Sequence, residues 1–163
     1  MYRVEITNSQ SCLELDDAFL RDVVTRTLAD ERVASATIGI LVVDNPTIRE
    51  LNRRHLAHDY YTDVLTFPLD CVVTPGNHDV DQSTLRGAGK HIEGEVVVSA
   101  EMAVDRAVEF GWRPEDELTL YIVHGLLHLA GYDDVDDAER LQMRKRERAI
   151  LAHWNLTPAK ADV

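Results

Sequence analysis

Apolar and polar residues alternate along residues 2–7, which is the pattern of a strand with one buried face. Residues 35–43 are nearly all apolar and rich in β-branched side chains, so they predict an interior strand covered on both faces. Two more strand-like runs are residues 63–67, which Pro68 closes, and residues 92–98. We expect these two runs to pair as a hairpin, which gives a sheet of about four strands.

Between these strands, apolar residues recur at steps of three and four positions, which predicts helices. About five helices are expected, over residues 15–28, 46–56, 99–111, 114–131 and 136–154. Ser99 and Gly111 are suited to cap the two ends of the third helix. The fourth helix is apolar around most of its circumference, so we expect it at the centre of the core. This order indicates an α+β fold, in which a small mixed sheet of about four strands packs against about five helices.

Residues 70–91 contain glycine and proline with little apolar periodicity, and they predict a mobile loop. The loop is longer than the usual connection of about 4–6 residues, so it is either a functional flap or a poorly ordered insertion. With 163 residues, 45% of them hydrophobic, the chain suits one globular domain over residues 1–163 rather than two domains.

The chain carries 29 acidic and 17 basic residues, which give a formal net charge of −12. This charge repels polyanions, so any RNA must meet a local basic patch or a metal. No apolar run approaches the roughly 20 residues of a membrane span, and the N-terminus lacks the order of a signal peptide. We therefore expect a cytoplasmic protein with no membrane partner. Cys12 and Cys71 are too far apart in sequence for a CxxC metal site, and we assign them no chemical role.

The segment HGLLHLAGYDD is the strongest candidate for chemistry. It begins with His124 and His128, which lie four residues apart on the predicted central helix, so both imidazoles lie over one face within reach of a single ion. Gly131 can end the helix and turn the chain back, which could bring Asp133 or Asp134 to the same ion. A catalytic zinc needs three protein ligands and an open position for water, and this segment could supply all three.

A solitary HxxxH pair on an apolar helix is more often two packed histidines than a metal site. Two features favour the metal here: unpaired imidazoles are costly in so apolar a helix, and a carboxylate follows the helix-ending glycine at short range. The pair is not a zinc-peptidase motif, because HExxH requires a glutamate where this chain has Gly125. The residues therefore predict a metal site, and spacing alone names no general base.

The run H-G-L-L-H-L-A-G-Y-D resembles the signature of the YbeY family of bacterial metal-dependent endoribonucleases, which are implicated in ribosomal RNA maturation. That signature reads H-G-x-L-H-L-x-G-Y-D-H. Residues 51–68 resemble the family segment that ends T-D-V-L-S-F-P, and residues 94–99 (GEVVVS) resemble its G-D-I-x-I-S strand. The resemblance covers most of the chain in order, and it implies an α+β fold, a zinc held by the histidine cluster and single-strand-directed RNA cleavage.

Two positions depart from the family pattern. Asp134 stands where a third histidine is usual, so the implied ligand set has two histidines and one carboxylate, which iron or manganese could also occupy. Leu56 stands where the family commonly has an arginine thought to hold RNA phosphate. Arg53 and Arg54 are the nearest replacements, although two arginines on a surface helix are more often a solvated face.

A second basic feature lies in the last predicted helix. Its basic residues are Arg140, Arg144, Lys145, Arg146 and Arg148. We take Arg144, Lys145 and Arg146 as candidate RNA contacts. The alternative is that these charges only suit the helix dipole, because acidic residues collect just before them.

With the resemblance, these features predict a metal-dependent, single-strand-directed endoribonuclease that acts in rRNA maturation and ribosome quality control. His124, His128 and Asp134 would hold one divalent ion, which we expect to be Zn²⁺, and the catalytic group would be a metal-bound water. The expected partners are rRNA and ribosomal proteins, and no DNA. Two alternatives remain: a non-catalytic ribosome-assembly or RNA-chaperone factor with a structural metal, and a metal hydrolase of another substrate. A fourth protein ligand would favour the structural metal, and an open coordination position would favour the enzyme.

Overall fold

The computed structural model describes residues 1–56, 63–73 and 85–158, which form an α+β fold. Its strands are β1 (Tyr2–Asn8), β2 (Ser35–Val43), β3 (Val64–Val73) and β4 (Lys90–Ser99). They form one sheet in the order β1-β2-β4-β3, in which β1, β2 and β4 are parallel and β3 is antiparallel at the edge. The mixed four-stranded sheet and the hairpin-like pairing of β3 with β4 confirm the prediction.

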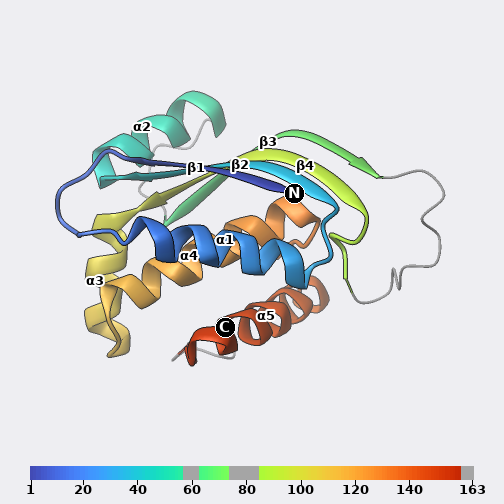
Figure 1. Ribbon diagram of the computed structural model, residues 1–163. Helices are drawn as coiled ribbons and strands as arrows, with labels where there is room; N and C mark the ends of the chain where they lie inside the picture. The colour runs from blue at the N-terminus through green and yellow to red at the C-terminus, as the bar shows by residue number, and fades with distance from the viewer. Residues whose placement is uncertain (57–62, 74–84, 159–163) are drawn as a thin grey trace.

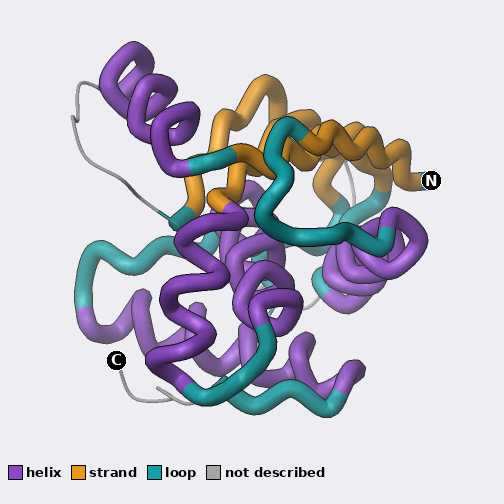
Figure 2. The backbone as a smooth tube through the Cα atoms, turned by 90° about the vertical axis from the view of Figure 1, so that its left-hand side faces the viewer, coloured by secondary structure: helices purple, strands orange, loops and turns teal. Residues whose placement is uncertain are grey.

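The described residues form five helices, as predicted. They are α1 (Asp17–Asp30), α2 (Asn45–Leu56), α3 (Ala100–Phe110), α4 (Pro114–Ala130) and α5 (Asp137–Leu151), which a 3₁₀ turn, Ala152–Trp154, follows. Figure 1 shows α1 and α4 beneath the sheet and α5 beneath them, and Figure 2 shows α2 alone on the opposite side of the sheet. None of the helices in the described part of the chain has the length and apolar character needed to cross a membrane.

Helix α4 lies at the centre of the larger hydrophobic cluster, as its apolar circumference predicts. It packs closely on the sheet at Gly125, where an added Cβ would lie 2.5 Å from Cγ1 of Val96 on β4. Because real side chains do not approach so closely, only glycine lets α4 lie at this distance from the sheet. The same contact leaves no space for the glutamate of a zinc-peptidase motif at this position.

Strands β3 and β4 extend beyond their predicted boundaries. β3 continues through Pro68, so the prediction that Pro68 closes the strand is wrong. The pairing of β3 with β4 shifts register between Pro68 and Asp70, and proline is tolerated at such bulges and on edge strands because its missing N–H breaks no regular ladder. β4 likewise begins at Lys90, so both ends of the predicted loop over residues 70–91 belong to strands. The middle of that loop, residues 74–84, lies outside the described residues.

The helix ends follow from local capping. Ser99 caps α3 and Gly111 ends it in the left-handed conformation (φ 75°), as predicted. The first helix does not begin at Leu15, because the carboxylate of Asp16 accepts the N–H of Phe19 and so fixes the N-cap at residue 16.

Candidate metal centre

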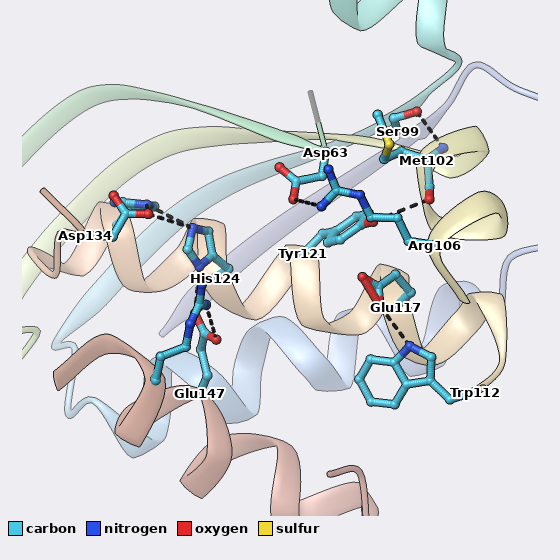
Figure 3. Close-up of polar contacts among 12 residues, drawn as sticks. Asp63, Ser99, Met102, Arg106, Trp112, Glu117, Tyr121, His124, Asp134 and Glu147 are labelled. Atoms are coloured by element: carbon cyan, nitrogen blue, oxygen red, sulfur yellow. Dashed lines mark hydrogen bonds and ion pairs between the residues drawn. The ribbon is translucent and has the colours of Figure 1, made fainter. Parts of the chain in front are cut away.

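Ring nitrogens of two α4 histidines converge with one carboxylate oxygen (Figure 3). Nε2 of His124 lies 3.1 Å from Nε2 of His128, and Oδ2 of Asp134 lies 3.8 Å and 3.9 Å from these two nitrogens. In the described ranges, no other three His, Cys, Asp or Glu residues bring potential ligand atoms this close together. The structure thus brings together the three residues that the sequence and the resemblance single out.

The local sequence explains this convergence. The four-residue spacing places His124 and His128 one above the other on α4. Gly131 follows the helix with φ 121°, a conformation that L-residues rarely adopt, and turns the chain back toward the histidines. Oδ1 of Asp133 accepts the N–H of Asp134 at 2.8 Å, so Asp134, and not Asp133, faces the two rings.

The second ring nitrogen of each histidine faces a hydrogen-bond acceptor. Nδ1 of His124 lies 2.6 Å from Oε2 of Glu147, and Nδ1 of His128 lies 3.1 Å from the backbone oxygen of Tyr132. A carboxylate and a carbonyl accept hydrogen bonds, so each Nδ1 is the donor, and in the neutral imidazole each Nε2 then presents a lone pair. In that form the two lone pairs lie 3.1 Å apart, and a shared cation between them would relieve their repulsion.

A transition-metal ion fits these residues. Metal–nitrogen bonds of about 2.1 Å in a tetrahedral arrangement place neighbouring ligand atoms about 3.4 Å apart, and the three separations given above bracket that value. Neutral imidazole and carboxylate are both ligands of such ions. In addition, the acceptors at Nδ1 are the partners that orient metal-binding histidines in proteins.

Burial and neighbouring charges set the protonation of the site. Burial raises the pKa of Glu147, which is 2% exposed, but the hydrogen bond with His124 and the Arg144 guanidinium 2.8 Å away outweigh burial and lower the pKa below its ordinary value. Burial and the neighbouring His124 lower the pKa of His128. Glu147 is therefore held ionised and His128 neutral, which is the form of imidazole that binds a metal.

A cavity of about 340 Å³ adjoins the cluster at His124 and Asp134. His124, Asp134 and Arg144 line one end of it, and Trp112 lines the other. Figure 3 shows that these two ends lie along α4, with Trp112 near the start of the helix and His124 near its end. The cavity gives water or a substrate group access to the open side of the cluster.

The two α2 arginines lie apart from this cavity. Arg53 and Arg54 occupy the last turn of α2, and neither lines the cavity. Their guanidinium groups lie 2.5 Å and 3.9 Å from Oε1 of Glu50, one turn earlier on the same helix. The structure therefore does not bring them to the metal centre.

The three predicted cations of α5 have different surroundings. Arg144 lines the cavity and pairs with Glu147, whereas Lys145 is exposed. Nε of Arg146 lies 2.6 Å from Oε2 of Glu31, which is 1% exposed, so this pair joins α5 to the end of α1. Only the first of the three is part of the cavity wall.

Glu147 is the functional residue that reasoning from the sequence missed. It interrupts a run of cations in α5 and is buried on the same helix as Met143 and Ile150. An acidic residue at a core-facing position of an otherwise basic helix is the signal that could have identified it, because a buried carboxylate needs a partner. The carbonyl of Tyr132 carries no such signal, since every residue has one.

Comparisons with known proteins point to one family. The model of the Endoribonuclease YbeY family matches residues 5–155. A Salinibacter ruber protein named Endoribonuclease YbeY is 37% identical over 148 residues, which cover 91% of this chain and 89% of that protein. Another of the same name, from Salinispora tropica, is 35% identical, with coverage of 96% and 99%. The solution structure of a Thermotoga maritima protein shares the fold, with a TM-score of 0.55 and 23% identity over 98% of this chain and 95% of that one. Because the family match spans almost the whole sequence, the chain belongs to the YbeY endoribonuclease family.

Proposed function

We propose that this protein is a metal-dependent endoribonuclease that cuts single-stranded RNA during rRNA maturation and ribosome quality control. Its membership of the family supports RNA cleavage. The convergence of two Nε2 lone pairs with the Asp134 carboxylate is the observation that carries the metal dependence. We further propose rRNA and ribosomal proteins as its partners, with DNA excluded as a substrate.

His124, His128 and Asp134 would hold one divalent ion, and we propose zinc because the three ligand atoms suit a tetrahedral site. When bound, the ion supplies Lewis-acid chemistry, since it polarises a phosphoryl oxygen and lowers the pKa of water to about 7. Of the three ligands, the two neutral imidazoles carry no charge, and the carboxylate cancels one of the ion's two positive charges. The site then keeps a net positive charge that attracts a phosphodiester, although the whole chain is acidic.

Residues around the ligands would orient them and the substrate. Glu147 holds His124 in the tautomer that presents Nε2, and the Tyr132 carbonyl does the same for His128. Arg144 lines the cavity beside these ligands, where its guanidinium group can donate to a phosphate oxygen.

The cavity favours a catalytic over a structural metal. Structural zinc sites are closed by four protein ligands, whereas a catalytic site keeps one position open. In the described part of the chain, three residues form the cluster, and the cavity adjoins it. A ribosome-assembly factor with a purely structural metal has no need of such an opening.

The test is cleavage of a single-stranded oligoribonucleotide by the purified full chain, before and after chelation. We expect cleavage that stops with the chelator and returns with added Zn²⁺, while an RNA duplex and single-stranded DNA of the same sequence stay intact. His124→Ala, purified in the same way, is the control for a contaminating nuclease. Cleavage that survives chelation, or that His124→Ala retains, would overturn the proposal.

A further inference from the structure

The cavity extends from the metal centre along α4 as far as Trp112, and several of the side chains that line it are aromatic or apolar. Phe110, Trp112 and Leu120 are among them, and we call these three residues the base pocket. The indole of Trp112 is bound to Glu117, which precedes His124 on α4 by seven residues. Seven residues correspond to about 10 Å along a helix axis, so the two ends of the cavity lie about two turns of α4 apart.

The indole of Trp112 is fixed at one edge. Its Nε1 donates to Oε2 of the buried Glu117 at 2.7 Å, which satisfies the one polar atom of the ring (Figure 3). Among the described residues, the two hydrophobic clusters include Trp154 but not Trp112. Trp154 packs against Phe19 with ring centroids 5.9 Å apart. Trp112 therefore lines the cavity with an aromatic ring that is held at Nε1, rather than filling the core.

We propose that the base pocket binds one unpaired RNA nucleobase, stacked on Trp112, while a neighbouring phosphodiester lies at the metal centre. This inference rests on the proposed function, because it takes RNA as the substrate. Aromatic side chains stack on any base, since every base has a π face. A base inside a duplex is already stacked and paired, so it cannot enter the pocket without being extruded. The pocket thus supplies a physical reason for cleavage of single strands.

Polar groups between the two ends of the cavity suit the edge of a base. Nη1 of Arg106 lies 3.2 Å from Oδ2 of Asp63, and both side chains line the cavity. Figure 3 shows this pair above α4, between Trp112 and His124, and beside Tyr121. A guanidinium group donates and a carboxylate accepts, so the pair offers both kinds of hydrogen bond to an extruded base.

The test compares an intact single-stranded oligoribonucleotide with versions that lack one base, each position in turn. Binding to the chelator-treated full chain is measured, so that no cleavage intervenes. We expect one abasic position to weaken binding about 5- to 150-fold, which is the contribution of one stacked base. Trp112→Leu should bind the intact and abasic strands equally. Val108→Ala, which removes an exposed apolar side chain from α3, should discriminate as the unmodified protein does.

A second measurement uses Trp154→Phe, in which Trp112 is the remaining tryptophan of the two in the chain. The intact strand should quench its fluorescence, and the strand lacking the critical base should not. The proposal is overturned if folded Trp112→Leu keeps the discrimination, or if the intact strand leaves Trp112 fluorescence unchanged. Base discrimination without metal-dependent cleavage would contradict the proposed function alone. Metal-dependent cleavage without discrimination would contradict the base pocket alone.

Discussion

Oε2 of Glu147 lies 2.6 Å from Nδ1 of His124, so a buried carboxylate of α5 fixes the tautomer of a candidate metal ligand on α4. Arg144, three residues earlier on α5, balances the charge of that carboxylate at 2.8 Å. The metal centre therefore depends on the packing of two helices, and not only on the segment that carries the histidines.

Glu147→Gln should weaken metal binding about 10- to 100-fold, the usual effect of removing a partner that orients a metal-binding histidine. The amide still accepts a hydrogen bond, but it no longer carries the negative charge that makes Nε2 a stronger ligand. Competition with a chromophoric chelator measures the affinity, and Glu109→Gln on the exposed side of α3 is the control. An affinity equal to that of the unmodified protein would show that Glu147 has no role at the ligand.

Asp134→Ala should abolish tight metal binding and RNA cleavage together, because two imidazoles alone do not form a tight site. We expect Asp134→Ala to lose more than the roughly 100-fold in metal affinity that is the upper value for removing a partner of a ligand, such as Glu147. Asp134→His should still bind metal, with a stronger preference for zinc over harder ions. Asp133→Ala is the matched control, since its side chain contacts the backbone of the next residue. Loss of metal by the Asp133 variant and retention by the Asp134 variant would reverse the assignment.

The sequence predicts well what depends on local periodicity. The central position of α4 and the convergence of His124 and His128 follow from a 3.6-residue repeat, and the return of Asp134 follows from the glycine that ends the helix. The resemblance favours Asp134 over Asp133 as the third ligand, and in the structure it is the Asp134 carboxylate that lies beside the two histidine nitrogens.

Features that depend on contacts between distant segments were not predicted. Glu147 meets His124 across 23 positions of sequence, and Arg146 meets Glu31 across 115. Local periodicity does not encode such pairs. The basic run in α5 therefore gave no sign that Arg146 forms an ion pair with a buried residue of another segment. Pro68 was misjudged for a similar reason, because its tolerance depends on the edge position of β3 in the assembled sheet.

Arg146→Gln should destabilise the protein by about 3–5 kcal/mol, because it leaves the buried Glu31 carboxylate without its ionic partner. Urea unfolding measures the loss, and Glu31→Gln combined with Arg146→Gln should recover part of it. A free energy of unfolding unchanged by Arg146→Gln would show that this pair has no structural role.

Lys145→Gln on the exposed side of the same helix is the matched control and should leave the free energy of unfolding unchanged. If Lys145 contacts RNA phosphate, as its place in the basic run of the sequence predicts, this variant should also flatten the slope of log affinity against log salt by about 0.7. An unchanged slope would remove Lys145 from the RNA-binding surface.

Glu117→Gln should stabilise the protein at neutral pH. Burial raises the pKa of Glu117 above its ordinary value, although hydrogen bonds from Trp112 and Tyr121 oppose the change. The unfolded chain therefore loses this proton at lower pH than the folded protein, and stability falls as the pH rises through this interval. The gain in unfolding free energy from the neutral amide should be complete at pH values above the raised pKa of Glu117. It should disappear at pH values below the ordinary pKa that this group has in the unfolded chain. Thermal unfolding from about pH 4 to about pH 8 measures it, and a gain that does not vary with pH would contradict the assignment.

The most direct test of the account loads metal-free protein with Zn²⁺ in steps and measures metal content and single-strand RNA cleavage on the same samples. The cluster of His124, His128 and Asp134 predicts that cleavage rises in proportion to bound metal and saturates at about one ion per chain. His128→Ala should neither retain the ion nor gain activity. Full cleavage by the metal-free protein, or tight binding of the activating ion by His128→Ala, would contradict the claim that these three residues hold a catalytic metal.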